Sequence, residues 1–262
     1  MTKQEKATAL ATAAMNTQVA LTVQYEEEAG AGFENADVNA YAIPFISILQ
    51  AMSPQCKKSD GAYIKGAEEG MFFNSVTQEI FPGDTGITAL PCYYKRVFLE
   101  WAPRETGGGF KGEHLPSDPI VSTTVRGDKG DILPNGNLLA DTRVHYVLIV
   151  NDDGTYSPAV ISLSSTQMKK SRQWMSKMEG IKFKRADGTL YTPPMFSHTY
   201  HLTTMPEQND KGSWYGLKVA TGGPLQDPGL FAAAKEFKRQ ISAGEVKEQP
   251  HAAPAADDGP PF

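Results

Sequence analysis

The chain has 262 residues, 40% of them hydrophobic, and a formal net charge of −5. This length holds one domain of about 200 residues with tails, or two small domains, and the hydrophobic fraction excludes disorder throughout. No run of 18 apolar residues occurs, which excludes a helical membrane span, and two cysteines without a Cys-x-x-Cys spacing indicate reduced, inert thiols.

The acidic charge lies at the two ends of the chain. Residues 1–29 have a net charge of −2 and residues 245–262 a net charge of −3, so residues 30–244 are neutral. A neutral body can still present a basic face, although domains that bind nucleic acids are often basic overall.

Residues 1–32 are predicted to form an N-terminal arm. Lys3 and Lys6 precede an alanine-rich stretch that loosely resembles a signal peptide, but threonine, asparagine and glutamine interrupt its apolar residues. We therefore expect a cytoplasmic protein whose arm is transiently helical.

The next segment, residues 33–244, is predicted to be mostly β. Short strand-like runs alternate with turns rich in glycine, proline, asparagine and aspartate. Residues 102–141 contain three consecutive glycines and little periodicity, which predicts a mobile loop or a flexible hairpin. The strongest predicted strands are residues 86–101, 142–151, 157–163, 195–204 and 214–221.

Two helices interrupt the strands. The first follows Ser164 and Ser165, whose hydroxyls can cap it, and runs to about residue 179, where Gly180 stops it. The second covers residues 227–242, where apolar side chains recur at helical spacing.

The order strands, helix, strands, helix argues against an alternating βαβ fold. It favours one domain, residues 33–244, built as an antiparallel barrel of the oligonucleotide-binding (OB) kind with one embedded helix and a C-terminal helix. An open β-sandwich is the alternative. Residues 245–262 are rich in proline, alanine and acidic residues and are predicted to form a disordered tail.

Binding of single strands without sequence preference needs cations along a groove and aromatic faces on which bases stack. Residues 93–101 supply both, because strand alternation places Tyr94, Arg96 and Phe98 on one face. Val97 and Leu99 favour the other face for the core. Core filling by these aromatic residues is an equally good reading.

Residues 169–185 carry seven basic residues against one acid, with Trp174 and Phe183 interleaved. An ordinary solvated helix face does not require such a concentration of charge. Residues 211–218 and the predicted strand 142–151 add further basic and aromatic side chains. The candidate DNA contacts are Tyr94, Arg96, Phe98, Trp101, Arg143, His145, Lys169, Lys170, Arg172, Trp174, Lys182, Lys184, Arg185, Trp214 and Lys218.

The last six residues read Asp-Asp-Gly-Pro-Pro-Phe. Phe262 offers an aromatic anchor, the two acids suit a basic rim, and the prolines limit the entropy lost on binding. This tip resembles that of bacterial single-stranded-DNA-binding proteins, which ends in an acidic cluster followed by Ile-Pro-Phe. The resemblance departs at Gly259 and Pro260, and it implies recruitment of replication or repair proteins. The residues that match are Asp257, Asp258, Pro261 and Phe262.

Three internal stretches carry a second resemblance. AIPFISILQAMSP at residues 42–54, LSSTQMKK at 163–170 and NDKGSWY at 209–215 look like phage-encoded proteins of this size. Those proteins are generally taken to be single-stranded-DNA-binding proteins. The similarity covers most of residues 33–240 and implies that the protein acts in an infected bacterium.

Catalytic and metal-binding patterns are weak. The five histidines lack metal-ligand spacing, and the glycine run at residues 107–109 lacks the Gly-Lys-Ser/Thr ending of a phosphate loop. We therefore expect neither an enzyme nor a bound cofactor or metal.

The sequence predicts a protein that coats single-stranded DNA in replication, recombination or repair and recruits partner proteins through its tip. It leaves the oligomeric state open. One alternative is a strand-annealing recombination protein. The other is a protein that does not bind DNA and inhibits host enzymes by imitating the tail of the host's DNA-binding protein.

Overall fold

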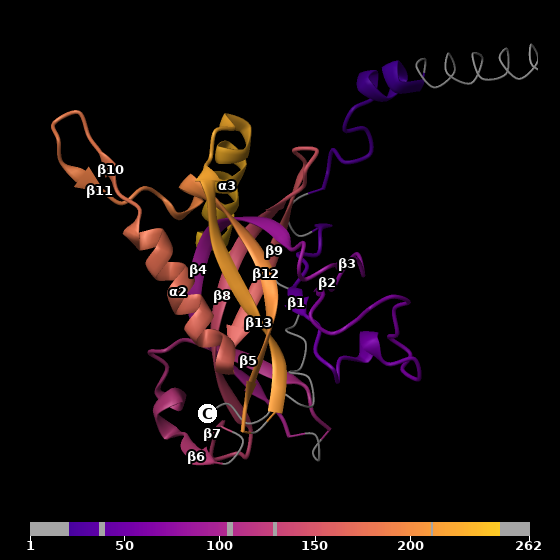
Figure 1. Ribbon diagram of the computed structural model, residues 1–262, viewed down its shortest axis with the longest axis vertical. Coiled ribbons are helices and arrows are strands. Elements are labelled where there is room, and N and C mark those ends of the chain that lie inside the picture. The colour runs from indigo at the N-terminus through magenta and orange to yellow at the C-terminus, as the bar shows by residue number, and fades with distance from the viewer. Residues whose placement is uncertain (1–20, 37–39, 104–106, 128–129, 211, 247–262) are drawn as a thin grey trace, which may run out of the picture. The chain divides into compact units, whose positions relative to one another are not determined.

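The computed structural model describes residues 21–36, 40–103, 107–127, 130–210 and 212–246 (Figure 1). Contacts divide the chain into two units, residues 1–41 and 42–262. In the first unit, residues 21–27 are helical and turns follow. The elements below belong to the second unit.

Five long antiparallel strands form the frame of the second unit. Their spatial order is β13-β12-β4-β8-β9, so the fourth strand along the chain lies beside the first. This arrangement is a Greek key extended by one strand, and it confirms the predicted mostly-β antiparallel fold. The strands are β4 (Ile87–Trp101), β8 (Leu138–Val150), β9 (Tyr156–Ser164), β12 (His198–Asn209) and β13 (Gly212–Pro224).

Between β9 and β13 the described chain shows no strand pairing. The free edge of β13 is instead satisfied by two glutamine side chains. Gln50 donates to the Tyr215 carbonyl at 3.0 Å and accepts from the Tyr215 N–H at 2.9 Å. Gln167, at the end of the 3-10 turn η5 (Ser165–Gln167), accepts from the Leu217 N–H at 3.0 Å. The barrel is therefore partly open, and side chains replace ladder bonds at the opening.

A small sheet of three short strands flanks β9. It comprises β1 (Ile46–Ile48), β2 (Phe72–Asn74) and β3 (Ile80–Phe81), all antiparallel. Just before β1, Phe45 forms a parallel bridge with Val160 of β9. This bridge attaches the small sheet to the long strands.

The barrel interior is filled from all five long strands and from helix α2 (Met168–Gly180). Trp174 and Met178 of α2 are buried there beside Tyr200 and Leu217. The 3-10 turn η5 precedes α2, and no serine side chain caps it, so the predicted serine cap is wrong. The predicted end of the helix near Gly180 is confirmed.

A second core lies on the opposite face of β4 and β8, beneath helix α3 (Pro228–Ser242). Leu230, Ala234 and Phe237 are buried at helical spacing, and the Phe237 ring meets Tyr146 of β8 edge-on at 6.4 Å. The Asp227 carboxylate caps the helix by accepting from the Gly229 N–H at 2.7 Å. The predicted helix 227–242 is thus confirmed to within one residue.

Residues 102–141 were predicted to form a mobile loop or a flexible hairpin, and the part that the structure describes forms paired strands and not a loop. That part folds into β5 (Phe110–His114), the 3-10 turn η4 (Pro119–Thr123), β6 (Val125–Gly127) and β7 (Gly130–Ile132). β5 pairs with β4, and β7 pairs with β8 and β6. Leu133 and Leu139 then cover Phe98 in a third, small core.

The remaining elements differ little from expectation. The predicted strand 195–204 begins with the 3-10 turn η6 (Met195–Ser197) and continues in β12 as far as Asn209. None of the described helices combines the length and the apolar character that a bilayer crossing requires.

Candidate nucleic-acid interface

Helix α2 separates an apolar face from a basic one. Ser171, Trp174 and Met178, three or four residues apart, are buried against the barrel. The other side of the helix faces solvent, and Lys169 and Arg172 are exposed there. Lys177, also exposed, reaches β13 and donates to the Val219 carbonyl at 2.7 Å.

A basic hairpin follows α2 directly, beyond its C-terminal end (Figure 1). It consists of β10 (Phe183–Lys184) and β11 (Leu190–Tyr191). The Phe183 and Tyr191 rings meet edge-on at 5.9 Å, and the Arg185 guanidinium lies over Tyr191 at 4.6 Å. Lys182 is bound to Glu179 at 3.1 Å, whereas Lys184 is exposed.

Strands β12 and β13 continue the basic surface on the other side of α2. Trp214 is half-buried, and its Nε1 donates to Glu207 Oε2 at 3.1 Å. Lys170 of α2 donates to the other oxygen of the same carboxylate. Lys218 is exposed further along β13.

We call this surface of α2, the β10–β11 hairpin and β13 the basic ridge. Within the part of the chain that the structure describes, Lys169, Arg172, Lys184 and Lys218 are exposed and form no ion pair. The basic residues of the ridge as a whole are Lys169, Lys170, Arg172, Lys177, Lys182, Lys184, Arg185 and Lys218.

The cations of β4 and β8 have a different environment, because carboxylates neutralise them. Lys95 binds Glu113 at 3.1 Å. Arg96 and Arg143 share Asp141, at 2.8 and 3.0 Å. These pairs follow from the register, which places Arg96 opposite Arg143 and Phe98 opposite Asp141. Of the predicted contacts, Arg96 and Arg143 therefore have partners within the protein.

Four predicted contacts are buried, which excludes direct stacking on a base. Phe98 lies in the third core, and Trp101 packs edge-on against Phe110 of β5 at 5.5 Å. His145 and Trp174 are both fully buried, with their rings stacked at 4.6 Å. The face of β4 that carries Phe98 was expected to be exposed, but η4, Leu133 and Leu139 cover it.

His145 is part of the barrel interior and not of a surface. Its Nε2 lies 2.7 Å from the Ser171 hydroxyl of α2. Burial lowers the pKa of His145 from 6.5 to about 3, so the ring is neutral at physiological pH. On its other side, the half-buried Tyr94 ring lies 5.2 Å away.

Two residues of the ridge were not found by sequence reasoning. Tyr191 supports Arg185, and the turn signal at Gly188 followed by an aromatic residue could have indicated it. Glu207 is the acid bound by Lys170 and Trp214. Its role depends on the β12–β13 register, which places it opposite Trp214, and no local pattern shows this.

The C-terminal tip cannot be placed in this site. Asp257, Asp258, Pro261 and Phe262 lie outside the described residues.

Fold and site together define a mostly-β, Greek-key protein with one basic, partly aromatic ridge. The family model described as "Pam3 phage gp34-like protein" matches residues 11–247, and the chain belongs to this family. The family description indicates a bacteriophage protein. Neither the curated proteins nor the solved structures contain a significant match to the chain.

Proposed function

We propose that the protein binds single-stranded DNA along the basic ridge with little sequence preference. One observation carries the proposal. Lys169, Arg172, Lys184 and Lys218 are exposed without ion-pair partners in the described chain, and Trp214 shares the Glu207 carboxylate with Lys170 of the same ridge. Unpaired cations attract the phosphate backbone, and aromatic rings accept the bases of any sequence.

The strand path supports the same function. A partly open, five-stranded Greek-key barrel with an embedded helix is the architecture of OB folds, which bind oligonucleotides. OB folds commonly bind through the face of their second and third strands. Here α3 packs on one face of β8, so we assign the DNA to α2 and β13 instead.

In this proposal the protein acts in the cytoplasm of an infected bacterium, where it coats strands exposed during replication, recombination or repair. The resemblance of Asp257, Asp258, Pro261 and Phe262 to the tip of bacterial single-stranded-DNA-binding proteins supports a recruiting role for the tail. The partners would be enzymes that act on the coated strand.

A titration with fluorescent oligo-dT at several salt concentrations tests the ridge. If about four phosphates are neutralised, log affinity should fall with log salt at a slope near −2.8. The double variant Lys169→Gln, Arg172→Gln should bind about tenfold more weakly and reduce the slope by about 1.4.

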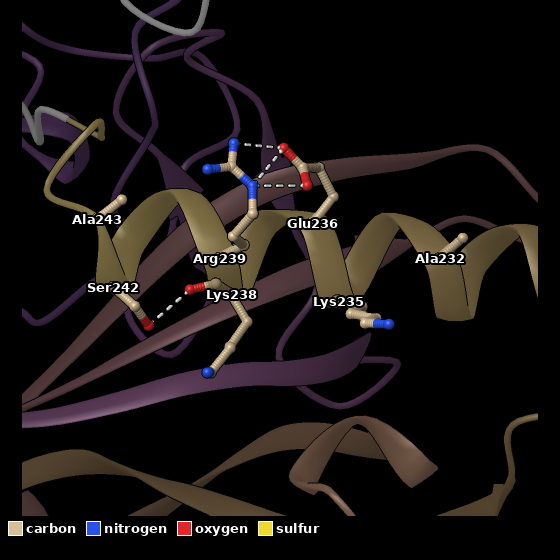
Figure 2. Close-up of a pocket in the computed structure, with 7 residues that line it drawn as sticks. All are labelled: Ala232, Lys235, Glu236, Lys238, Arg239, Ser242 and Ala243. Atoms are coloured by element: carbon tan, nitrogen blue, oxygen red, sulfur yellow. Dashed lines mark hydrogen bonds and ion pairs between the residues drawn. The ribbon is translucent and has the colours of Figure 1, made fainter.

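Helix α3 provides a matched control. Lys235 and Lys238 are exposed, and they line a hollow formed by α3 side chains (Figure 2). Nearby, Arg239 is already bound to Glu236 and Glu245. The double variant Lys235→Gln, Lys238→Gln removes the same charge away from the ridge and should bind nearly as wild type. Equal losses in both variants would argue against the ridge. No affinity for single strands in the wild type would refute the function and favour a pure interaction protein.

A further inference from the structure

The basic ridge contains one carboxylate that two donors hold in a defined place. Lys170 of α2 donates to Glu207 Oε1, and Trp214 Nε1 donates to Oε2 at 3.1 Å. The side chains of Lys170 and Glu207 are only 17% and 22% exposed. The carboxylate is therefore held at the junction of α2 with β12 and β13.

Gly216 provides the space for this carboxylate. It lies on β13 two residues after Trp214, on the same strand face, and a Cβ at this position would collide with the Glu207 carboxylate. Lys218 follows two residues later on that face and is exposed. The glycine and the two donors thus form a cradle for an anion.

A phosphodiester can use the same donors. Like a carboxylate, it presents two oxygens that share a negative charge, and charge-assisted hydrogen bonds to such oxygens are among the stronger ones. The Lys170 ammonium and the Trp214 indole N–H donate without needing to accept, so either anion satisfies them.

We propose that this cradle is a phosphate-binding site and that Glu207 occupies it when no DNA is bound. A backbone phosphate of the bound strand takes the place of the carboxylate, which moves into solvent. The Trp214 N–H then donates to this phosphate in place of Glu207. Glu207 thereby sets the affinity of the ridge. The inference rests on the proposed binding of single strands.

Removal of the competing charge should then strengthen binding. In an oligo-dT titration, Glu207→Gln should bind about three- to tenfold more tightly than wild type, because the phosphate no longer displaces a carboxylate. The salt dependence should also steepen, by about 0.7 in slope, because Lys170 enters the complex without an internal counterion.

Two further variants separate this site from a general charge effect. Glu236→Gln removes an acid that binds Arg239 on α3, away from the ridge, and should change affinity less than about twofold. Glu207→Asp keeps the charge but withdraws the carboxylate from its donors by one methylene group. It should bind more tightly than wild type, whereas a general charge effect would leave it unchanged.

The outcomes distinguish this inference from the function on which it rests. If wild type binds oligo-dT but Glu207→Gln and Glu207→Asp both bind with unchanged affinity and slope, the cradle is a structural clamp and the inference is wrong. If Glu207→Gln unfolds, Glu207→Asp decides alone. If wild type does not bind, the proposed function and the cradle both fail. A gain with Glu207→Gln that Glu236→Gln matches would also overturn the site.

Discussion

Four rings, one each from β4, β8, α2 and β12, pack against one another. The His145 ring lies 5.2 Å from Tyr94 and stacks on Trp174 at 4.6 Å, and Trp174 also meets Tyr200 edge-on at 5.9 Å. These contacts join β8 to α2, because His145 also bonds to Ser171. The ring system therefore positions the helix that carries the basic ridge.

Trp174 and Trp214 should consequently behave in opposite ways on truncation. Trp174→Ala leaves a cavity in the barrel and should lower the free energy of unfolding by about 3–5 kcal/mol. Trp214→Ala should leave the fold intact and cost about 1–3 kcal/mol in binding single strands, as loss of a stacking residue does. Urea unfolding followed by circular dichroism measures the first effect, and oligo-dT titration measures the second. A folded Trp214→Ala variant that binds like wild type would remove this residue from the interface.

At the scale of elements, the backbone groups at the free edge of β13 are hydrogen-bonded by side chains. Leu217 is buried, and its N–H is satisfied by Gln167 instead of by a neighbouring strand. Gln167 also donates to the Tyr215 carbonyl at 3.3 Å. A residue of the turn before α2 thus keeps β13 in place beside the helix.

Gln167→Ala should therefore destabilise the protein by about 1–3 kcal/mol, because it leaves a buried N–H without a partner. Gln173→Ala, on the exposed side of α2, is the matched control and should change stability by less than about 0.5 kcal/mol. Chemical denaturation of both variants tests the difference. Equal stabilities would show that water replaces the glutamine at this edge.

The long elements could be predicted because their patterns are local. Alternation over 142–151 and helical spacing over 227–242 each occur within one segment, and β8 and α3 were found there. The elements β5 to β7 are only three to five residues long. They are held by pairing with one another and with β4 and β8, contacts that sequence spacing does not show.

The candidate site was predictable to a similar extent. The basic run of 169–185 identified most of the ridge, because a charge excess is visible in one segment. Which cations are neutralised depends on register and packing between distant segments. Asp141 meets Arg96 only through the β4–β8 ladder, and Glu207 meets Lys170 only once α2 lies beside β12.

At the scale of the whole molecule, charge is separated along the chain. Residues 30–244 are neutral overall and contain the basic ridge, while residues 245–262 carry a net charge of −3. In the proposed function these parts have different tasks, since the ridge binds phosphates and the tail binds proteins. They should therefore be separable by mutation.

Deletion of residues 257–262 tests that separation. The described cores consist of residues between 43 and 246, so the fold should be unchanged, as thermal unfolding would show. Affinity for oligo-dT should stay the same or rise slightly, because two carboxylates that repel phosphate are removed. Capture of a replication or repair protein from host lysate should be lost.

Phe262→Ala should lose nearly as much of this capture, because the ring is the large apolar anchor of the tip. His251→Ala, in the same tail but outside the tip, is the control and should capture as wild type. If the truncated and intact proteins recover the same partners, the tip has no recruiting role, and the DNA-binding proposal then depends on the ridge alone.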